Sequence, residues 1–359
     1  MKILLAVPGH LRTVPMGRYS FDALSALGHE VVMFDYHGGL LDRFDDRWRG
    51  LIRRFSGGGA AEEKRSVNLH LRRVIDEWRP SVFITIFGID VSIETLEYLR
   101  ARRVASACWW INDPFQFQRS LHKARHYDVL CSNSAGSVVD YRSAGVSQAY
   151  FLPTACDPAV HRVSQARPEY ACDVCFAGDW SPLREQVMEG LANEFDVRVF
   201  GPWEKKLAPG SRLRARLSDG FFAPDDMAAI FSSAKVVLNI HTWYGRFDHG
   251  VNPRLFEAAG CGAFQLVDWK REIPELFDCR AEVRCYRDIG ELAPLLREVL
   301  ADATARKAAA AAAQRRAYSE HSYVHRMRRL LEIVTSPPPP RCGFSGPVTR
   351  SSQNGEKSP

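Results

Sequence analysis

The sequence predicts an α/β protein built from two doubly wound domains in tandem. Three observations support this fold class. The 359 residues suit two domains better than one. Short apolar runs alternate with amphipathic helical stretches through residues 1–152 and again through residues 173–334, a pattern typical of parallel strands joined by crossover helices. Between these halves, residues 153–172 contain prolines and little periodicity, so we expect the domain linker there.

The first half alternates between strand-like and helix-like patterns from its first residues. The opening "MKILLAVPG" predicts a strand and not a signal peptide, because no small-residue cleavage site follows it. We expect strands over residues 3–7, 31–35, 82–87, 104–110, 129–132 and 149–152. We expect helices over residues 16–27, 62–78, 92–102, 118–125 and 135–144.

The second half repeats the alternation and ends in helices. We expect strands over residues 174–177, 197–200, 236–240, 263–267 and 282–285. We expect helices over residues 182–193, 225–232, 253–259, 289–300 and 304–331, and the last of them could pack back on the N-terminal domain. Residues 335–359 contain "SPPPP" and few apolar residues, so we expect a disordered tail.

The composition narrows the possible partners. Hydrophobic residues make up 46% of the chain, enough for two full cores. The formal net charge of +6 fits anionic small molecules or a weak peripheral membrane contact, and it is too small to indicate nucleic acid binding. No apolar stretch is long enough to span a membrane.

The nine cysteines are scattered through expected strands and helices. An odd number in such positions indicates reduced thiols in a cytoplasmic protein. Cys172 and Cys175 form the one local pair, in "CDVC". Because no second pair or histidine cluster accompanies them, we interpret them as buried structural thiols and expect no metal site.

The segment "NPRLFEAAG" carries the clearest candidate site. Asn252 suits a helix cap and Pro253 a first helical position, so the free N–H groups beyond them could bind phosphate. Arg254 could add a charged contact, and Glu257 lies on the same helix face, where its carboxylate could accept hydrogen bonds from ribose hydroxyls. The alternative is a simple intrahelical ion pair between Arg254 and Glu257.

Two other stretches in the second half suit a ligand at the carboxyl ends of the strands. In "FAGDWSPLRE", Gly178 permits a close approach of the ligand, and Arg184 lies in the first turn of a helix capped by Ser181. The loop "HTWYGRFDHG" brings His241 and His249 together with aromatic and charged residues. Loops of this composition on a rigid sheet commonly bind ligands.

The first half offers two candidates for acid–base chemistry. His10 follows the first strand in "VPGHLRTVP", and an imidazole there could remove a hydroxyl proton. Asp113, in "WWINDP", could be a base, could orient an acceptor, or could cap the next turn, since Asp-Pro commonly starts turns. The glycine-rich "SGGGA" at residues 56–60 follows no strand and lacks the spaced dinucleotide fingerprint, which argues against an NAD-linked reductase.

Several segments resemble the CgeB family of GT-B glycosyltransferases. In the second half these are "DVCFAGDWSPLRE", "SSAKVVLNIH" and "NPRLFEAAGCGAFQLVD"; in the first half they are "WWINDP", "YDVLCSNSAGSVVDYRSAG" and "YFLPTACDPAVH". The resemblance covers roughly residues 1–330. It implies two Rossmann-like domains facing across a cleft, with an acceptor-side domain at 1–152 and a nucleotide-sugar domain at 173–334.

The resemblance also implies an activity and its residues. The chain would move a sugar from a nucleoside diphosphate donor to an acceptor hydroxyl, with no cofactor and no essential metal. Related retaining enzymes carry two glutamates eight positions apart. Glu257 matches the second, which binds the ribose, whereas His249 stands where the first would be. This departure leaves the contact to the sugar and the stereochemistry open.

Two rival functions fit the same architecture. One is a nucleotide-sugar epimerase, which would turn over its donor without any acceptor. The other is a sugar-nucleotide-binding or coat-assembly protein without turnover, and the histidine at position 249 keeps this rival open.

Overall fold

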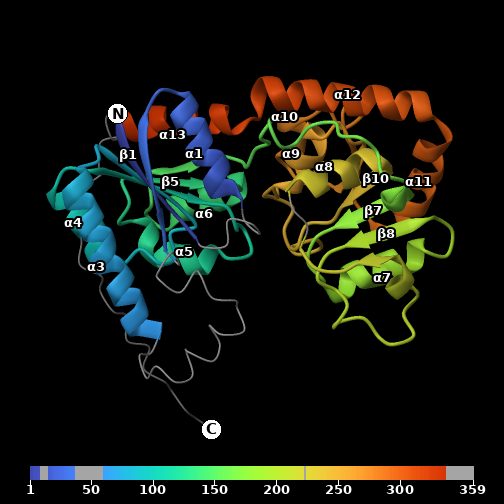
Figure 1. The fold of residues 1–359 in the computed structure, drawn as a ribbon, viewed down its shortest axis with the longest axis horizontal. Helices are drawn as coiled ribbons and strands as arrows, with labels where there is room; N and C mark the ends of the chain where they lie inside the picture. Colours follow the sequence, from blue (N-terminus) through green and yellow to red (C-terminus); the bar gives the residue numbers. More distant parts are fainter. Residues whose placement is uncertain (9–14, 37–59, 222–223, 337–359) are drawn as a thin grey trace, which may run out of the picture.

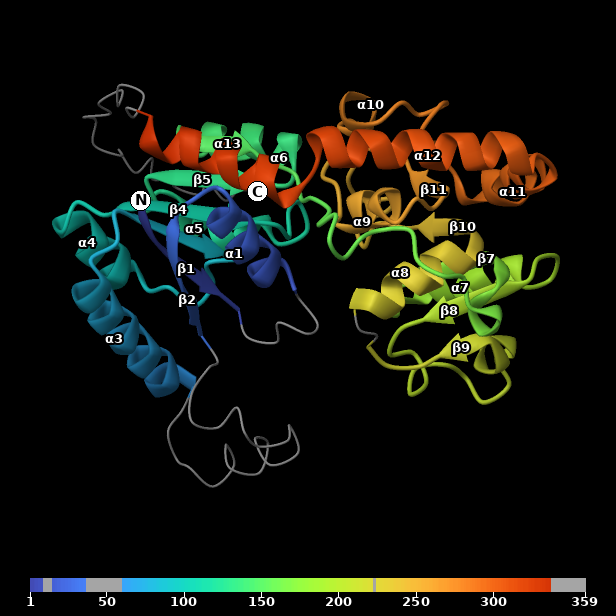
Figure 2. The ribbon, with the colours of Figure 1, turned by 45° about the horizontal axis from the view of Figure 1, so that its top comes forward.

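The computed structural model describes residues 1–8, 15–36, 60–221 and 224–336. It contains two α/β domains lying side by side, and the C-terminal helices run across both of them (Figures 1 and 2). Each domain is organised around one sheet of six parallel strands. The predicted fold class, two doubly wound α/β domains, is confirmed.

The N-terminal sheet has the strand order β2-β1-β3-β4-β5-β6. Its strands are β1 (Lys2–Val7), β2 (Glu30–Asp35), β3 (Val82–Ile86), β4 (Ala105–Trp110), β5 (Val129–Ser132) and β6 (Ala149–Phe151). Its helices are α1 (Met16–Ala26), α3 (Ala60–Trp78), α4 (Ile93–Ala101), α5 (Phe117–Ala124) and α6 (Ala135–Ser143). Every residue of β3 and β5 is buried, as expected for parallel strands covered on both faces.

The C-terminal sheet has the order β12-β11-β10-β7-β8-β9. Its strands are β7 (Cys172–Ala177), β8 (Val197–Phe200), β9 (Leu217–Ser218), β10 (Ala234–Asn239), β11 (Gln265–Asp268) and β12 (Arg284–Tyr286). The helices after the linker are α7 (Pro182–Leu191), α8 (Pro224–Ser233), α9 (Arg254–Gly260), α10 (Ile273–Leu276), α11 (Leu292–Ala301), α12 (Ala303–Glu320) and α13 (Tyr323–Thr335). Short 3-10 turns lie at Pro168–Tyr170, Arg212–Arg216 and Ile289–Glu291.

We expected one helix over residues 304–331, but the structure has two helices there, so that expectation was wrong. A second helix begins because Ser322 and His325 form a capping box, in which each side chain bonds the other's backbone N–H. At the break, Cys156 of the linker exchanges backbone hydrogen bonds with His321 and Tyr323, at 2.9 and 3.0 Å. Helix α12 therefore stays on the C-terminal domain, and α13 crosses to the N-terminal one (Figure 1).

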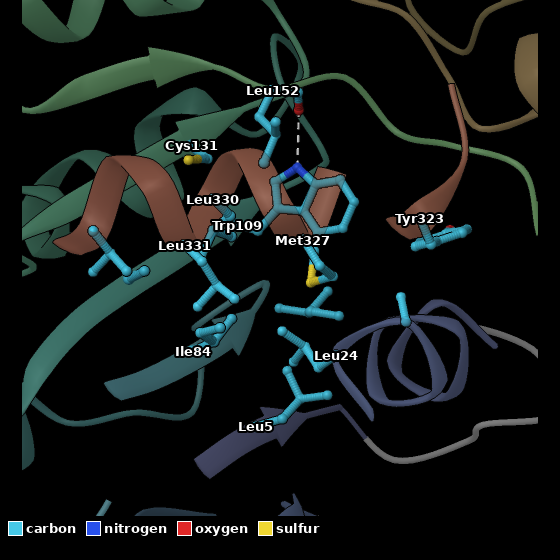
Figure 3. Close-up of a cluster of buried hydrophobic side chains, with 14 of the residues drawn as sticks. Leu5, Leu24, Ile84, Trp109, Cys131, Leu152, Tyr323, Met327, Leu330 and Leu331 are labelled. Atoms are coloured by element: carbon cyan, nitrogen blue, oxygen red, sulfur yellow. Dashed lines mark hydrogen bonds between the residues drawn. The ribbon is translucent and has the colours of Figure 1, made fainter. Parts of the chain in front are cut away.

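Helix α13 completes the core of the N-terminal domain. Its buried residues Met327, Leu330 and Leu331 pack in one cluster with Trp109 of β4 (Figure 3). The indole of Trp109 donates a hydrogen bond to the Leu152 carbonyl at 2.9 Å. The end of the chain that the structure describes is thus an integral part of the first domain.

Both sheets have a point at which the strand order reverses. In the N-terminal sheet it lies between β1 and β3, and in the C-terminal sheet between β7 and β10. Ligands of open parallel sheets bind beyond the carboxyl ends of the strands at such points. None of the helices in the described parts of the chain is long and apolar enough to cross a membrane.

Candidate functional site

A cavity of about 510 Å³ lies where the two reversal points face each other. From the N-terminal domain it is lined by Pro15 and Met16 at the start of α1 and by Phe87 after β3. From the C-terminal domain it is lined by Gly178 after β7 and Ile240 after β10, among others. Its volume is within the range of small-molecule sites. We call it the donor cavity below, after the nucleotide-sugar donor that the resemblance stated above leads us to expect in the second domain.

Arg184 is the buried cation of the donor cavity. Ser181 caps α7, and Arg184 lies in the first turn of that helix. The side chain of Arg184 lies inward, and the residue is only 8% exposed. The guanidinium donates to the carbonyls of Asp179 and Ile240 at 2.9 and 2.6 Å and to the Thr242 hydroxyl at 3.2 Å. It forms no ion pair with the described residues, and its Nε has no hydrogen-bond partner among them.

Burial lowers the pKa of Arg184, but an arginine stays protonated at neutral pH. The cavity wall therefore holds a positive charge whose hydrogen bonds all go to neutral oxygens, while Asp179 and Asp268 act on it without forming an ion pair. Such a charge is costly unless an anion binds to it. This property of Arg184 is the strongest single indication of what the donor cavity binds.

Arg254 and Glu257 line the donor cavity together. The guanidinium Nη1 of Arg254 lies 2.8 Å from Oε2 of Glu257, which is the intrahelical pair considered above as the alternative. Met227 and the ring of Phe231 pack against the same guanidinium. The second oxygen of Glu257, Oε1, accepts no hydrogen bond from the residues that the structure describes. The pair thus occupies one carboxylate oxygen and leaves the other for a ligand.

The start of α9 differs from expectation by one residue. The helix begins at Arg254, with Pro253 at the cap position, although Oδ1 of Asn252 accepts a hydrogen bond from the Leu255 N–H at 3.2 Å. Asn252 therefore performs the predicted capping. Its side chain already accepts a hydrogen bond from one of the N–H groups expected to bind phosphate. The charge on Arg184 is therefore a stronger indication of an anion site than the start of α9. Asn252 and Pro253 both line the donor cavity.

His241 lies behind the cavity wall and not in it. It is 1% exposed; its Nδ1 lies 2.7 Å from Asp268, and its Nε2 accepts from the Asn252 N–H at 3.1 Å. Although burial acts in the opposite direction, His241 and Lys270 lower the pKa of Asp268 to about 2. The prediction that His241 contacts the donor is not supported by this geometry, because the ring is used to hold Asn252.

Gly178 and Gly201 bring the ends of β7 and β8 close together beside the cavity. A Cβ on Gly201 would lie only 2.2 Å from the Gly178 carbonyl oxygen. The same carbonyl accepts a hydrogen bond from the indole of Trp203 at 2.8 Å. Gly178 lines the cavity as expected, and the close approach explains why a side chain at Gly201 would displace this wall.

Asp113 lies inside the N-terminal domain. It is 0% exposed and lines neither large cavity of the described residues. Burial raises the pKa of its carboxyl to about 7, although hydrogen bonds from Ser132 at 2.6 Å and Tyr141 at 3.3 Å act in the opposite direction. The predicted contact with an acceptor is therefore not supported, because two hydroxyl groups and the protein interior enclose the carboxylate.

His249 lies at the junction of the two domains. Its Nδ1 is 2.7 Å from the Ser134 hydroxyl of the N-terminal domain. Next to it, Glu272 accepts backbone hydrogen bonds from Gly250 of its own domain at 2.9 Å and from Ala135 across the junction at 2.8 Å. His249 lines a different hollow, and its expected contact with the donor is not supported because Ser134 holds the ring outside the donor cavity.

His10 lies outside the described residues, so its role remains a prediction. Sequence reasoning missed Phe221 and Thr242 of the cavity wall and Glu272 of the domain junction. Asp268 was also missed, although its place at the end of an apolar run was a usable signal; it is the last residue of β11. Phe221 had no such signal because it follows a strand of only two residues.

Cys172 and Cys175 are both buried in the core of the C-terminal domain, as expected. The closest thiol pair found among the described residues is a different one. The sulfur atoms of Cys279 and Cys285 lie 3.2 Å apart, and both residues are partly exposed. A turn lies between these two cysteines in the sequence. Neither strand nor helix periodicity therefore predicts their contact.

Comparison with known proteins finds a family resemblance in the second domain. Residues 182–332, which include Arg184, Arg254 and Glu257, match the family model described as "Glycosyl transferase-like". The match covers most of the C-terminal domain and less than half of the whole chain. The chain is also 24% identical over 207 residues to the spore protein CgeB of Bacillus subtilis, an alignment that spans 54% of this chain and 65% of that protein. The resemblance to the CgeB family is confirmed.

Solved structures extend the similarity to both domains. HepE of Anabaena, solved with UDP and glucose, superimposes with a TM-score of 0.66 at 14% identity, covering 93% of this chain and 99% of that one. Sucrose-phosphate synthase from Thermosynechococcus elongatus gives a TM-score of 0.67 at 10% identity, covering 92% and 98%. At these identities the likeness shows the fold, and the GT-B architecture of two Rossmann-like domains is confirmed.

Proposed function

We propose that this protein is a glycosyltransferase that moves a sugar from a nucleoside diphosphate donor to an acceptor hydroxyl. The observation that carries the proposal is the buried guanidinium of Arg184, which lines a cavity between the domains without an ion-pair partner among the described residues. A diphosphate would supply the missing negative charge. The family match over residues 182–332 and the UDP complex of HepE support the same reading.

The residues of the cavity suit the parts of such a donor. Arg184 would contact the diphosphate, and Arg254 would add a second positive charge from α9. The free Oε1 of Glu257 would accept a hydrogen bond from the ribose. The exposed ring of Phe221, at the rim of the cavity, suits a nucleobase, which packs well against an aromatic face.

Rate enhancement would come mainly from stabilising the leaving group. As the bond between the sugar and the diphosphate breaks, negative charge grows on the diphosphate oxygens. Arg184 is already fixed by three hydrogen bonds, so it would need no rearrangement to stabilise that charge. We further propose a hexose donor, because HepE was solved with UDP and glucose. We also propose that no metal ion is needed, because the guanidinium groups of Arg184 and Arg254 both line the cavity where the diphosphate would bind.

Nucleotide binding tests the proposal directly. Thermal shift and calorimetry with UDP, GDP and their sugars should show one diphosphate that stabilises the wild-type protein. Arg184→Gln and Glu257→Ala should each weaken its affinity about tenfold to hundredfold, because each removes hydrogen bonds that involve a charged group. The control variants Arg315→Gln and Glu97→Ala remove exposed charges from α12 and α4 and should bind like the wild type.

Product analysis separates the rival functions. Incubation of a labelled donor with and without candidate acceptors should give transfer that depends on the acceptor. An epimerised nucleotide sugar formed without acceptor would indicate the epimerase, and tight binding with no turnover would indicate a binding protein. If no nucleoside diphosphate binds, or if both cavity variants bind as tightly as the wild type, the proposed function is wrong.

A further inference from the structure

A second large hollow lies between the domains and has no part in the donor cavity. Its volume is about 750 Å³. One wall is the first half of α6 in the N-terminal domain, and the other is formed by the loops that follow β10, β11 and β12. Among the described residues, the hollow and the donor cavity share no lining residue. Both therefore lie at carboxyl ends of strands, but at different positions along the domain interface.

The hollow carries an excess of positive charge. Two of its four cations are neutralised locally: Lys270 lies 2.6 Å from Asp268, and Arg271 lies 2.7 Å from Asp248. Arg246 and Arg287 line the same hollow and form no ion pair with any described residue. Among the described lining residues, only Asp140 on α6 carries a carboxylate without an ion pair.

Aromatic neighbours restrict the position of Arg287. Its guanidinium lies 3.9 Å from the centre of the Trp269 ring, and the Tyr244 hydroxyl donates to its backbone carbonyl at 3.2 Å. Phe247 adds a third aromatic residue to the lining. A fixed guanidinium is suited to bidentate binding of a carboxylate or phosphate, and aromatic rings provide apolar faces for the C–H groups of a sugar.

From these features we infer that the hollow binds the acceptor, and that the acceptor is a saccharide carrying a carboxylate or phosphate group. This inference rests on the proposed function, since it assigns the second substrate of the same reaction. Arg246 and Arg287 bind the acidic group, and the aromatic lining contacts the sugar ring. The loop after β10 connects the two spaces, since its Thr242 lines the donor cavity and its Tyr244 lines the hollow, so an acceptor hydroxyl can approach the donor along this loop.

Ligand-observed saturation-transfer NMR tests this inference with three probes: glucuronic acid, glucose 6-phosphate and glucose. Each is titrated into the protein with UDP and again without it. At least one acidic sugar should bind about tenfold tighter than glucose, because a charge-assisted bidentate contact is worth that much or more. Whichever acidic probe binds identifies the group, carboxylate or phosphate.

Two variants and a control locate the binding. The double variant Arg246→Gln/Arg287→Gln should lose the preference for the acidic sugar and keep the wild-type affinity for UDP. Arg315→Gln, which removes an exposed arginine from α12, should change neither. The inference is overturned if glucose binds as tightly as both acidic probes, if no probe binds, or if the double variant keeps the preference. Failure of the wild type to bind any nucleoside diphosphate would instead contradict the proposed function.

Discussion

Burial separates the predicted residues that can meet a ligand from those that cannot. Arg184 and Glu257 are largely buried yet line the donor cavity, whereas Asp113 and His241 are enclosed on all sides by protein. The residue types alone could not make this distinction. A carboxylate after a strand is equally compatible with a cleft and with an interior hydrogen-bond network, and Asp113 belongs to the network.

The raised pKa of Asp113 makes the stability of the protein depend on pH. Its carboxyl titrates at about 7 in the folded protein, against an ordinary value of 3.8. Because the folded state holds the proton more tightly, the contribution of Asp113 to stability is full below about pH 4 and is lost as the pH rises through about 7. We expect the free energy of unfolding of the wild type to fall over this range relative to that of Asp113→Asn.

Urea denaturation of both proteins at about pH 5 and about pH 8 measures this effect. The difference between wild type and variant should change in favour of the variant at the higher pH, by at most about 1.4 kcal/mol per pH unit. A difference that stays constant between the two pH values would show that Asp113 has an ordinary pKa.

At the scale of elements, the periodicity of the sequence predicts most strands and helices, and it fails where a side-chain contact sets a boundary. The strand and helix alternation predicted both sheets, because buried parallel strands are continuous apolar runs. The break between α12 and α13 depends on Ser322, His325 and a linker residue distant in sequence, so a helical pattern continues across it. Strand β9 and helix α10 are too short to show a period.

Helix α13 should contribute strongly to the stability of the N-terminal domain. Leu330 is fully buried in the cluster with Trp109. Leu330→Ala should lower the free energy of unfolding by about 2 to 5 kcal/mol, because it removes buried methyl groups and leaves a cavity. Leu69→Ala is the matched control, since Leu69 of α3 is half exposed. Chemical denaturation compares the two, and equal small losses would show that α13 is only loosely attached.

At the scale of the whole molecule, the two domains are joined on the side of α6 by hydrogen bonds as well as by the chain. The carboxylate of Glu272 accepts from the backbone of Gly250 in its own domain and from Ala135 in the other. The side chain of Asn133 adds a bond to the Val251 carbonyl at 2.9 Å across the same junction. A Cβ on Gly250 would lie 2.8 Å from Pro114 of the other domain, so the close packing of Gly250 against Pro114 needs a glycine.

Removal of the Glu272 carboxylate should uncouple the domains. Glu272→Ala leaves the buried N–H of Gly250 and the partly buried N–H of Ala135 without an acceptor. It should therefore cost about 2 to 5 kcal/mol and split thermal unfolding into two transitions. Glu275→Ala, on the exposed side of the short helix α10 that begins just after Glu272, should unfold like the wild type. Calorimetry distinguishes the results, and a single transition at the wild-type temperature for Glu272→Ala would refute the coupling.

The central claim is that the cavity between the two sheet-reversal points holds a nucleoside diphosphate sugar against Arg184. A crystal structure of the protein with bound UDP tests this claim most directly. We predict density for the diphosphate within hydrogen-bond distance of the Arg184 guanidinium, with the ribose at Glu257. Density for UDP at any other place, with Arg184 still bonded only to its neutral oxygen partners, would contradict the account.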